Sequence, residues 1–182
     1  MLRSETIASR LIYSGHVLDL RVDTVRLGDR PPVEREVADN INSVVVVAVS
    51  DEREVLLVRQ WRHPVGRVLL EAPAGHVDPG ETPRDAAERE LREETGHAAR
   101  NLTPLPGFWI APGWATEYMD AYLATGLERS PLPQDEDEDV ELARTPLNDV
   151  PRLIREGAIA DAKTIAALLS ALCLYPEALP GG

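Results

Sequence analysis

Three glutamates within residues 75–96 have the spacing of a metal site. The stretch GHVDPGETPRDAAERELREETG carries seven carboxylates and three arginines. On a helix, Glu90 and Glu94 are four residues apart and Glu93 is three residues from Glu90, so the three side chains share one face. Like charges at this spacing repel by about 0.2–0.5 kcal/mol per pair, and a divalent cation would compensate them. Oxygen ligands suit Mg²⁺ or Mn²⁺, whereas the alternative for this spacing alone is a solvated helix with ordinary salt bridges.

The helix that would position these carboxylates has start and stop signals. Thr82 is a suitable N-cap, Pro83 suits the first helical position, and Gly96 follows the last turn. Arg89 lies four residues before Glu93 and could hold one carboxylate in place. The sequence therefore predicts a helix that begins near Pro83 and ends just before Gly96.

Apolar runs on both sides of this helix predict the strands of a sheet. SVVVVAVS at 43–50 and EVLLVRQW at 54–61 are typical of strands, the first fully buried, and a turn is expected between them. Strands interleaved with helices indicate an α/β or α+β fold, in which helices cover a mixed sheet. Further strands are expected in the first forty residues, at RVLLEAPAG (67–75), near 102–110 and 117–124 and at VELAR (140–144), with helices within 147–156 and 161–174.

Composition restricts the class of protein. The 182 residues are 43% hydrophobic and 27% charged, which fits one soluble domain. The formal net charge of −12 opposes binding to nucleic acid. No apolar run is long enough for a membrane span, and the first ten residues lack the apolar core of a signal peptide, so we expect a cytoplasmic protein. The single Cys173 is expected to be a buried structural thiol on a helix face.

The complete stretch, rather than the spacing of three glutamates, resembles the Nudix box. That pattern is G-x5-E-x7-R-E-U-x-E-E-x-G-U, with U aliphatic, and its fixed positions are all met from Gly75 to Gly96. A chance match is expected in on the order of one window in 10⁸ to 10⁹. His97 replaces the last aliphatic residue, which we interpret as a local packing change. The resemblance implies hydrolysis of a nucleoside diphosphate linked to another moiety, on an α/β/α sandwich with a mixed central sheet and an N-terminal antiparallel strand region.

The metal ligands of the Nudix family fall on four positions of this sequence. The resemblance implies ligation by Glu90 and Glu94, with Glu93 close by. It also implies that the backbone carbonyl of Ala74, the residue before the box, is a ligand. Two or three Mg²⁺ or Mn²⁺ ions would then neutralise the substrate pyrophosphate and make a water more acidic.

Residues outside the box resemble the ADP-ribose pyrophosphatase subfamily. EAPAGHVDPGE is similar to the E-x-P-A-G lead-in of these enzymes, and Pro112 lies sixteen residues after Gly96, where they place a marker proline. APGWATEYMDAYLA resembles their S-P-G-x-x-x-E segment, with Ala111 in place of Ser and Glu117 as the acidic residue near the substrate. The resemblance covers most of residues 35–174.

The same resemblance suggests residues that bind substrate. Arg62 and Arg35 fall where the subfamily has substrate-contacting arginines, and a guanidinium is a planar donor suited to phosphate and ribose oxygens. Trp114, in a Pro-Gly loop, is the candidate for stacking on adenine, although any one aromatic residue is more often part of a core. In relatives the N-terminal strands exchange across a dimer, which implies a homodimer.

An acidic loop, DEDEDVEL at 135–142, resembles the loop that supplies a late carboxylate in the subfamily. Aligning its strand with the family places Glu138 nearest the metals, as a candidate ligand, and Glu136 two residues farther away, as a candidate general base. A solvated turn is the alternative, in which case Glu93 is the first candidate for the base.

The sequence thus predicts a single Nudix domain over 1–182, with N-terminal, dimer-forming strands in 1–40 and the catalytic fold in 41–182, including a box at 75–97. The expected reaction is metal-dependent hydrolysis of ADP-ribose to AMP and ribose 5-phosphate. The alternatives are action on another substrate, such as FAD, NADH, a nucleoside diphosphate sugar or a diadenosine polyphosphate, and a module that binds ADP-ribose without cutting it.

Overall fold

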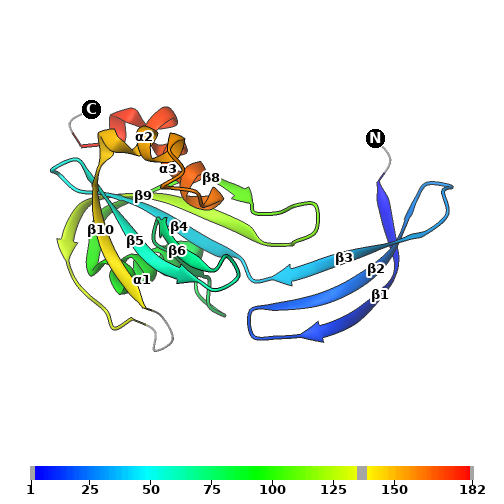
Figure 1. The fold of residues 1–182 in the computed structure, drawn as a ribbon. Helices are drawn as coiled ribbons and strands as arrows, with labels where there is room; N and C mark the ends of the chain where they lie inside the picture. The colour runs from blue at the N-terminus through cyan, green and yellow to red at the C-terminus, as the bar shows by residue number, and fades with distance from the viewer. Residues whose placement is uncertain (1–2, 135–138, 181–182) are drawn as a thin grey trace. The chain divides into compact units, whose positions relative to one another are not determined.

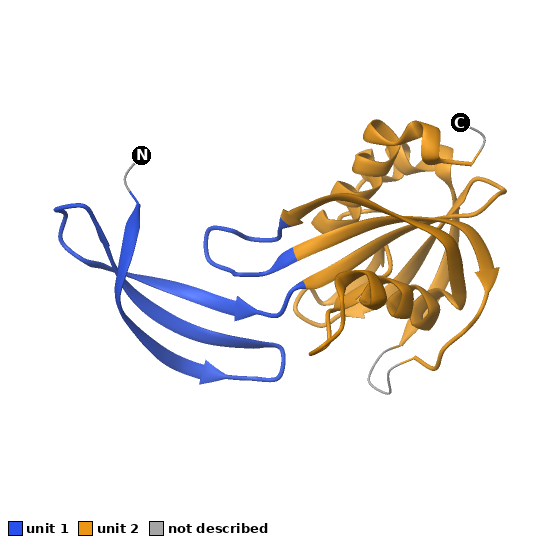
Figure 2. Cartoon of the chain, turned by 180° about the vertical axis from the view of Figure 1, so that it is seen from behind, with its two compact units in different colours: residues 1–42, 109–118 blue, residues 43–108, 119–182 orange. Residues whose placement is uncertain are grey.

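A computed structural model describes residues 3–134 and 139–180 of the chain (Figure 1). Contacts between residues divide the chain into two compact units (Figure 2). The first unit comprises residues 1–42 and 109–118, and the second comprises residues 43–108 and 119–182. Within the described residues, no helix is long and apolar enough to cross a membrane.

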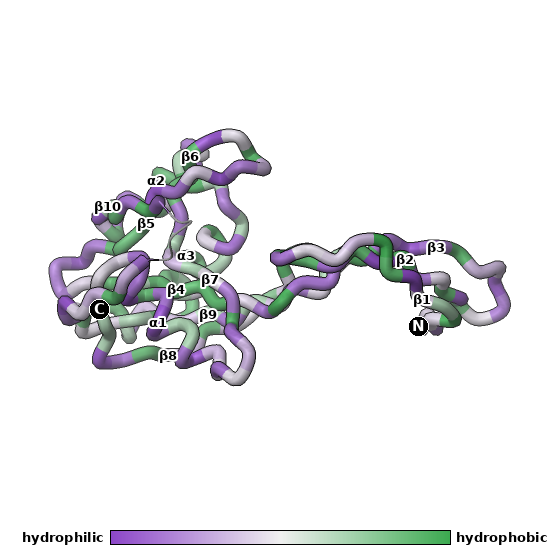
Figure 3. Tube along the Cα trace, turned by 90° about the horizontal axis from the view of Figure 1, so that it is seen from below, coloured by the Kyte–Doolittle hydropathy of each residue, from purple (hydrophilic) through white to green (hydrophobic). Residues whose placement is uncertain are grey.

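In the first unit, the described residues form an antiparallel sheet of three strands in the order β1-β2-β3. Its strands are β1 (Ser4–Ser14), β2 (Leu18–Leu27) and β3 (Val33–Asn40). Every residue of β1 is exposed, and hydrophobic and hydrophilic residues both occur along this sheet (Figure 3). On β2, Asp23 is the one buried residue, at 6% exposure, and it accepts a hydrogen bond from Ser9 Oγ at 2.7 Å.

The segment 109–118 is held to β3 by backbone hydrogen bonds. Ala38 N donates to Trp114 O at 2.8 Å, and Thr116 N donates to Ala38 O at 3.0 Å. The Trp109 and Tyr118 rings meet edge to face with centroids 5.1 Å apart. These long-range contacts place a loop with the N-terminal strands rather than with its neighbours in sequence.

The second unit is built on a mixed sheet. Its described strands follow the order β10-β5-β4-β9-β8, with β6 beside β5 and β7 beside β4. β4 pairs in parallel with β9 and antiparallel with β5. The strands are β4 (Ser43–Val49), β5 (Glu54–Arg62), β6 (Arg67–Glu71), β7 (Ala74–His76), β8 (His97–Trp109), β9 (Tyr118–Arg129) and β10 (Val140–Pro146).

Helices cover both faces of this sheet. The central strand β4 carries apolar side chains on both faces, and all of them are buried. Val44, Val46 and Ala48 belong to one apolar cluster, which also contains residues of α1 (Pro83–Thr95). The alternate residues of β4 belong to a second cluster, which also contains residues of α3 (Ala162–Leu174). The expected α/β/α sandwich with a mixed sheet is confirmed. The remaining helices are α2 (Val150–Arg155) and the 3₁₀ turns η1 (Leu147–Asp149) and η2 (Pro176–Ala178).

Two local expectations were wrong. β8 begins at His97, directly after the box glycine, rather than near residue 102. Cys173 is exposed, because α3 buries Thr164, Ala167, Leu168 and Ala171, and position 173 lies off that face.

Candidate active site

The helix of the box, α1, begins and ends at the residues that the sequence predicted. Thr82 is extended, with φ −86° and ψ 155°, and its hydroxyl accepts a hydrogen bond from Asp85 N at 3.2 Å. Pro83 occupies the first turn. Gly96 ends the helix in the left-handed region at φ 73°, where its N–H donates to Arg92 O at 3.1 Å.

The same helix buries two of the three predicted glutamates. Ala86, Ala87 and Leu91 are fully buried against the sheet, and this packing carries Glu90 and Glu94 inward, to 7% and 4% exposure. Isolated buried carboxylates are costly, so these two require compensating charge. The protein supplies part of that charge itself.

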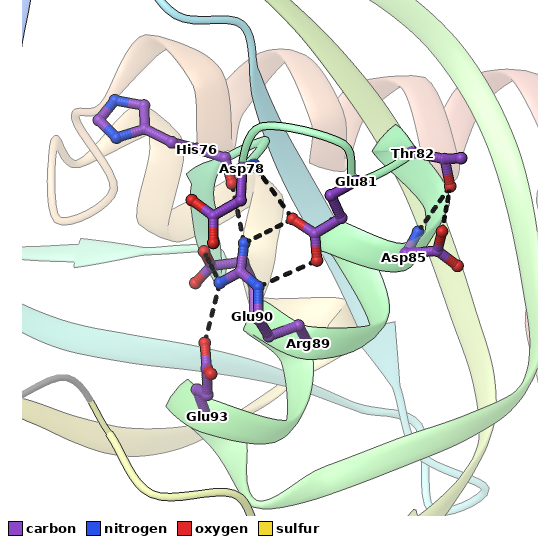
Figure 4. A network of polar contacts seen from close by, with 8 residues as sticks. All are labelled: His76, Asp78, Glu81, Thr82, Asp85, Arg89, Glu90 and Glu93. Atoms are coloured by element: carbon purple, nitrogen blue, oxygen red, sulfur yellow. Dashed lines mark hydrogen bonds and ion pairs between the residues drawn. The ribbon is translucent and has the colours of Figure 1, made fainter.

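Arg89 is the centre of the polar network in Figure 4. Its Nε and Nη2 atoms donate to the two carboxylate oxygens of Glu81 at 3.1 and 3.0 Å, and Nη2 also donates to His76 O at 2.9 Å. Its Nη1 donates to Glu90 at 2.6 Å and to Glu93 at 3.0 Å. The hydrogen bonds that Glu81 itself accepts from Arg89 lower the pKa of Glu81. One planar guanidinium thus fixes three box carboxylates, where the sequence predicted one.

Gly75 lies against Glu90. A Cβ atom at position 75 would lie 1.9 Å from Glu90 Oε1 and 2.2 Å from Glu90 Cδ. Gly75 belongs to β7, which pairs with β4, so its backbone has little room to retreat. The Glu90 carboxylate therefore lies in the space that a side chain at position 75 would fill.

These donors fit a hard divalent cation. The cradle of Gly75 holds one buried carboxylate, a second follows one helical turn later at Glu94, and the Ala74 carbonyl precedes the glycine. Oxygen donors of this kind suit Mg²⁺ or Mn²⁺. Among residues 3–134 and 139–180, no three acidic, histidine or cysteine side chains form a ready-made cage.

Arg62, at the end of β5, lies in the same unit as the box. Its Nε and Nη2 atoms donate to the two oxygens of Glu71 at 2.9 and 2.8 Å. The hydrogen bonds to Glu71 raise the pKa of Arg62, and the charge of Glu94 adds to this effect. The Arg62 side chain is 35% exposed, so it remains accessible to an anion.

Three other predicted residues lie in the first unit. Arg35 is exposed on β3 and donates to the carbonyl of Glu34 at 3.0 Å. Trp114 is 61% exposed. Glu117 accepts a hydrogen bond from Asn40 Nδ2 at 3.4 Å.

The acidic-loop candidates, Glu136 and Glu138, lie outside the described residues. The described residues beside them are anchored. Leu132 N donates to the carbonyl of Arg92 on α1 at 3.3 Å, and Gln134 Nε2 donates to Val140 O at 3.2 Å.

Sequence reasoning met Glu71 only as the first residue of the EAPAG lead-in and gave it no role, and it missed Asp161 and Lys163; these three residues form a second polar network with Arg62. Their contacts join residues as much as 92 positions apart, so no local spacing reveals them. One signal was available. Lys163 is the only lysine in a chain that has 18 arginines.

Known proteins resemble this chain over most of its length. It is 40% identical to an ADP-ribose pyrophosphatase of Bacillus subtilis (92% of this chain, 91% of the relative). It is 36% identical to a methanol dehydrogenase activator of Bacillus methanolicus (92% of each). An ADP-ribose pyrophosphatase of Mycobacterium tuberculosis is 37% identical (91% of this chain, 82% of the relative).

A solved structure and a family model agree with these relatives. The crystal structure of an ADP compounds hydrolase superposes with a TM-score of 0.86 at 22% identity, covering 96% of this chain and 95% of the other, which shows the same fold. The NUDIX domain model matches residues 39–168. Members of that family generally depend on divalent metals and act on nucleoside diphosphate derivatives. The chain therefore belongs to the Nudix family, and it is a Nudix hydrolase similar to the ADP-ribose pyrophosphatases.

Proposed function

We propose that this enzyme hydrolyses the pyrophosphate of ADP-ribose to AMP and ribose 5-phosphate. The intact box carries the proposal, with Glu90 and Glu94 buried on one helix face and Glu90 seated against Gly75. The choice of ADP-ribose is supported by the 40% identity to the Bacillus subtilis ADP-ribose pyrophosphatase.

The residues that would hold two or three Mg²⁺ or Mn²⁺ ions are Glu90, Glu94 and the carbonyl of Ala74, with Glu93 and Glu138 as further candidates. When bound, such ions would supply positive charge that offsets the negative charge developing on the phosphate oxygens and would make a water more acidic. Arg89 holds the carboxylates of the box at fixed separations, so little reorganisation is needed before reaction.

The chain's own side chains would bind the substrate and move the proton. Arg62 offers a guanidinium for the phosphates, and we propose the same for Arg35. Trp114 is the proposed stacking partner of the adenine, and Glu117 is the proposed acidic contact. Glu136 is the proposed general base, because resemblance to the subfamily places it two residues beyond Glu138, the proposed metal ligand.

We also propose that the enzyme is a homodimer formed through its N-terminal strands. Leu11, Ile12 and Tyr13 of β1 are 60%, 44% and 61% exposed, and a second copy would cover such apolar side chains. Light scattering after size-exclusion chromatography should give about twice the 20.0 kDa chain mass, and Leu11→Lys should lower it. A monomeric mass for the unmodified chain would contradict the proposal.

Two alternatives to ADP-ribose hydrolysis can be distinguished by which compounds the protein binds and which it hydrolyses. Another diphosphate, such as FAD, NADH, a nucleotide sugar or a diadenosine polyphosphate, would preserve the role of the box and change only the pockets around it. A module that binds ADP-ribose without cutting it would not need Glu90, Glu93 and Glu94, and all three are present.

The decisive experiment is a panel of these compounds assayed with Mg²⁺ and with Mn²⁺, with products identified by chromatography. We expect ADP-ribose to be the best or nearly the best substrate and AMP to be released. Turnover of ADP-ribose at less than about a hundredth of the rate of another member would overturn the choice of substrate. Binding of ADP-ribose without turnover of any compound would favour the non-catalytic module.

A further inference from the structure

Lys163 is out of place by two simple criteria. It is the only lysine beside 18 arginines, and it lies in the first turn of α3, where the helix dipole disfavours a cation. Its side chain is nevertheless only 13% exposed. Such a position is stable only if nearby carboxylates compensate the charge.

Two carboxylates provide this compensation. Lys163 Nζ donates to Asp161 at 2.8 Å and contacts Glu71 Oε2, whose side chain is 1% exposed. Arg62 donates to both oxygens of the same carboxylate, so that Oε2 accepts from both Arg62 and Lys163, and the network contains two cations and two anions. Burial alone would raise the pKa of Glu71, but Arg62 and Lys163 outweigh it and the pKa is lowered.

The first turn of α3 also holds the strand that leads into the box. Asp161 caps the helix, accepting from Thr164 N at 3.1 Å and from Thr164 Oγ1 at 2.6 Å. Thr164 Oγ1 in turn accepts from Ala72 N at 2.8 Å. The first turn of α3 therefore binds both Glu71, through Lys163, and the backbone of Ala72, through Thr164. Ala72 is two residues before Ala74, whose carbonyl is a proposed metal ligand.

Exposure separates Arg62 from the other members of the network. Glu71, Asp161 and Lys163 have side chains no more than 17% exposed, whereas that of Arg62 is 35% exposed. Glu94 of the box is among the charges that raise the pKa of Arg62, after the hydrogen bonds to Glu71. The buried members thus form a support, and Arg62 is the member that a ligand can reach.

We propose that Glu71 and Lys163 are positioning residues that hold Arg62 for contact with the anionic substrate. Lys163 keeps Glu71 ionised and in place, and Glu71 fixes the plane of the guanidinium through two parallel hydrogen bonds. A long arginine held in one rotamer loses less conformational freedom when a phosphate binds. The proposal rests on the proposed function, in which Arg62 contacts the substrate.

A double-mutant cycle tests the proposal. Glu71→Gln should raise KM for the best substrate of the panel, expected to be ADP-ribose, about tenfold or more, with a smaller change in kcat, because the charge that orients Arg62 is lost. In an Arg62→Ala background, the same change should alter KM less than about twofold, since no guanidinium remains to be positioned. A purely structural Glu71 would give the same fold-change in both backgrounds, and that result would overturn the proposal.

Three further variants secure the interpretation. Lys163→Gln should raise KM by part of the increase seen for Glu71→Gln. Lys163→Arg keeps the positive charge, so its KM should be lower than that of Lys163→Gln. Glu54→Gln is the matched control, since it removes a carboxylate from an ion pair with Arg144 on the same sheet and should leave KM unchanged. If Glu71→Gln does not fold, Glu71→Asp, which keeps the charge but shortens its reach, takes its place in the cycle with the same expected non-additivity.

The assays use whichever panel compound is turned over best, so the two proposals fail differently. Absence of turnover on every compound would refute the proposed function. Additive effects of positions 62 and 71 on an active substrate would refute only the positioning role.

Discussion

Replacing Gly75 by alanine tests whether the box glycine exists to make room for Glu90. The new Cβ atom would lie 1.9 Å from Glu90 Oε1, whereas ordinary contacts begin near 3.4 Å, so the carboxylate must retreat by about 1.5 Å. That movement breaks its 2.6 Å hydrogen bond with Arg89. A misplacement of about 1 Å at a reacting centre can cost roughly a hundredfold in rate, so kcat/KM for ADP-ribose should fall by about 10² or more.

The free energy of unfolding should fall by no more than the activation free energy rises, which is about 2.7 kcal/mol for a hundredfold loss of rate. Losing a charge-assisted hydrogen bond costs about 1.5–3 kcal/mol, while Gly→Ala recovers about 0.4–1 kcal/mol by restricting the unfolded chain, leaving a loss of about 0.5–2.6 kcal/mol. Gly96→Ala is the matched control. Its φ of 73° makes alanine cost about 1–2 kcal/mol, but its Cβ would meet Pro131 at an ordinary 3.7 Å. Thermal unfolding should therefore rank the two variants alike, and only Gly75→Ala should lose activity. Equal activities in the two variants would refute this reasoning.

Three further predictions concern charge. Glu94→Gln should lower kcat by about 10² or more at an unchanged or higher Tm, because it removes one of several like charges from the helix face. Asp85→Asn is the control: it removes an exposed charge from the first turn of the helix and should cost a little stability and almost no activity. Equal losses of activity in the two variants would argue against a specific metal face. Glu136→Gln should depress kcat by about 10² to 10⁴, while Glu138→Gln should raise the Mg²⁺ concentration needed for half-activity, and near-normal behaviour of both would leave the loop a solvated turn. The pKa of Glu71 in the folded protein is below its ordinary 4.5, so the ionised carboxylate stabilises the fold above that pH, and this stabilisation is lost as pH falls through the lowered pKa. The Tm of Glu71→Gln should therefore be below that of the unmodified protein at pH 7 and should depend less on pH below about 4.5. Parallel curves of Tm against pH for the two proteins would count against this.

The second unit was predictable where burial is uniform along a strand. β4 is buried at every residue, so its sequence is a continuous apolar run and reads as a central strand without knowledge of its partners. The start of β8 was missed because HAARN is polar and follows a helix-ending glycine, and its strand conformation is imposed by pairing with β9. The association of residues 109–118 with β3 rests on contacts between Ala38 and residues 114–116, which are too far apart in sequence to leave a local pattern.

The site divides in the same way. The hydrogen bond between Arg89 and Glu93 follows from helical spacing alone and was predicted. The contact of Gly75 with Glu90 depends on how β7 packs beside α1, and spacing could identify the glycine but not its purpose. The Glu71–Lys163 pair needs the whole fold, although composition marked Lys163 as unusual.

The crowding of like charge in the box is resolved by the geometry of one side chain. Arg89 binds Glu81 with one edge and shares its Nη1 atom between Glu90 and Glu93, so three carboxylates are held by a single positive charge. One cation cannot neutralise three anions, and Glu94 adds a fourth, buried charge. Arg89 therefore leaves an excess of negative charge among box carboxylates that it already holds in position. Divalent cations, on which the Nudix family generally depends, would complete that balance and would let a polyanionic substrate approach a helix that otherwise repels it.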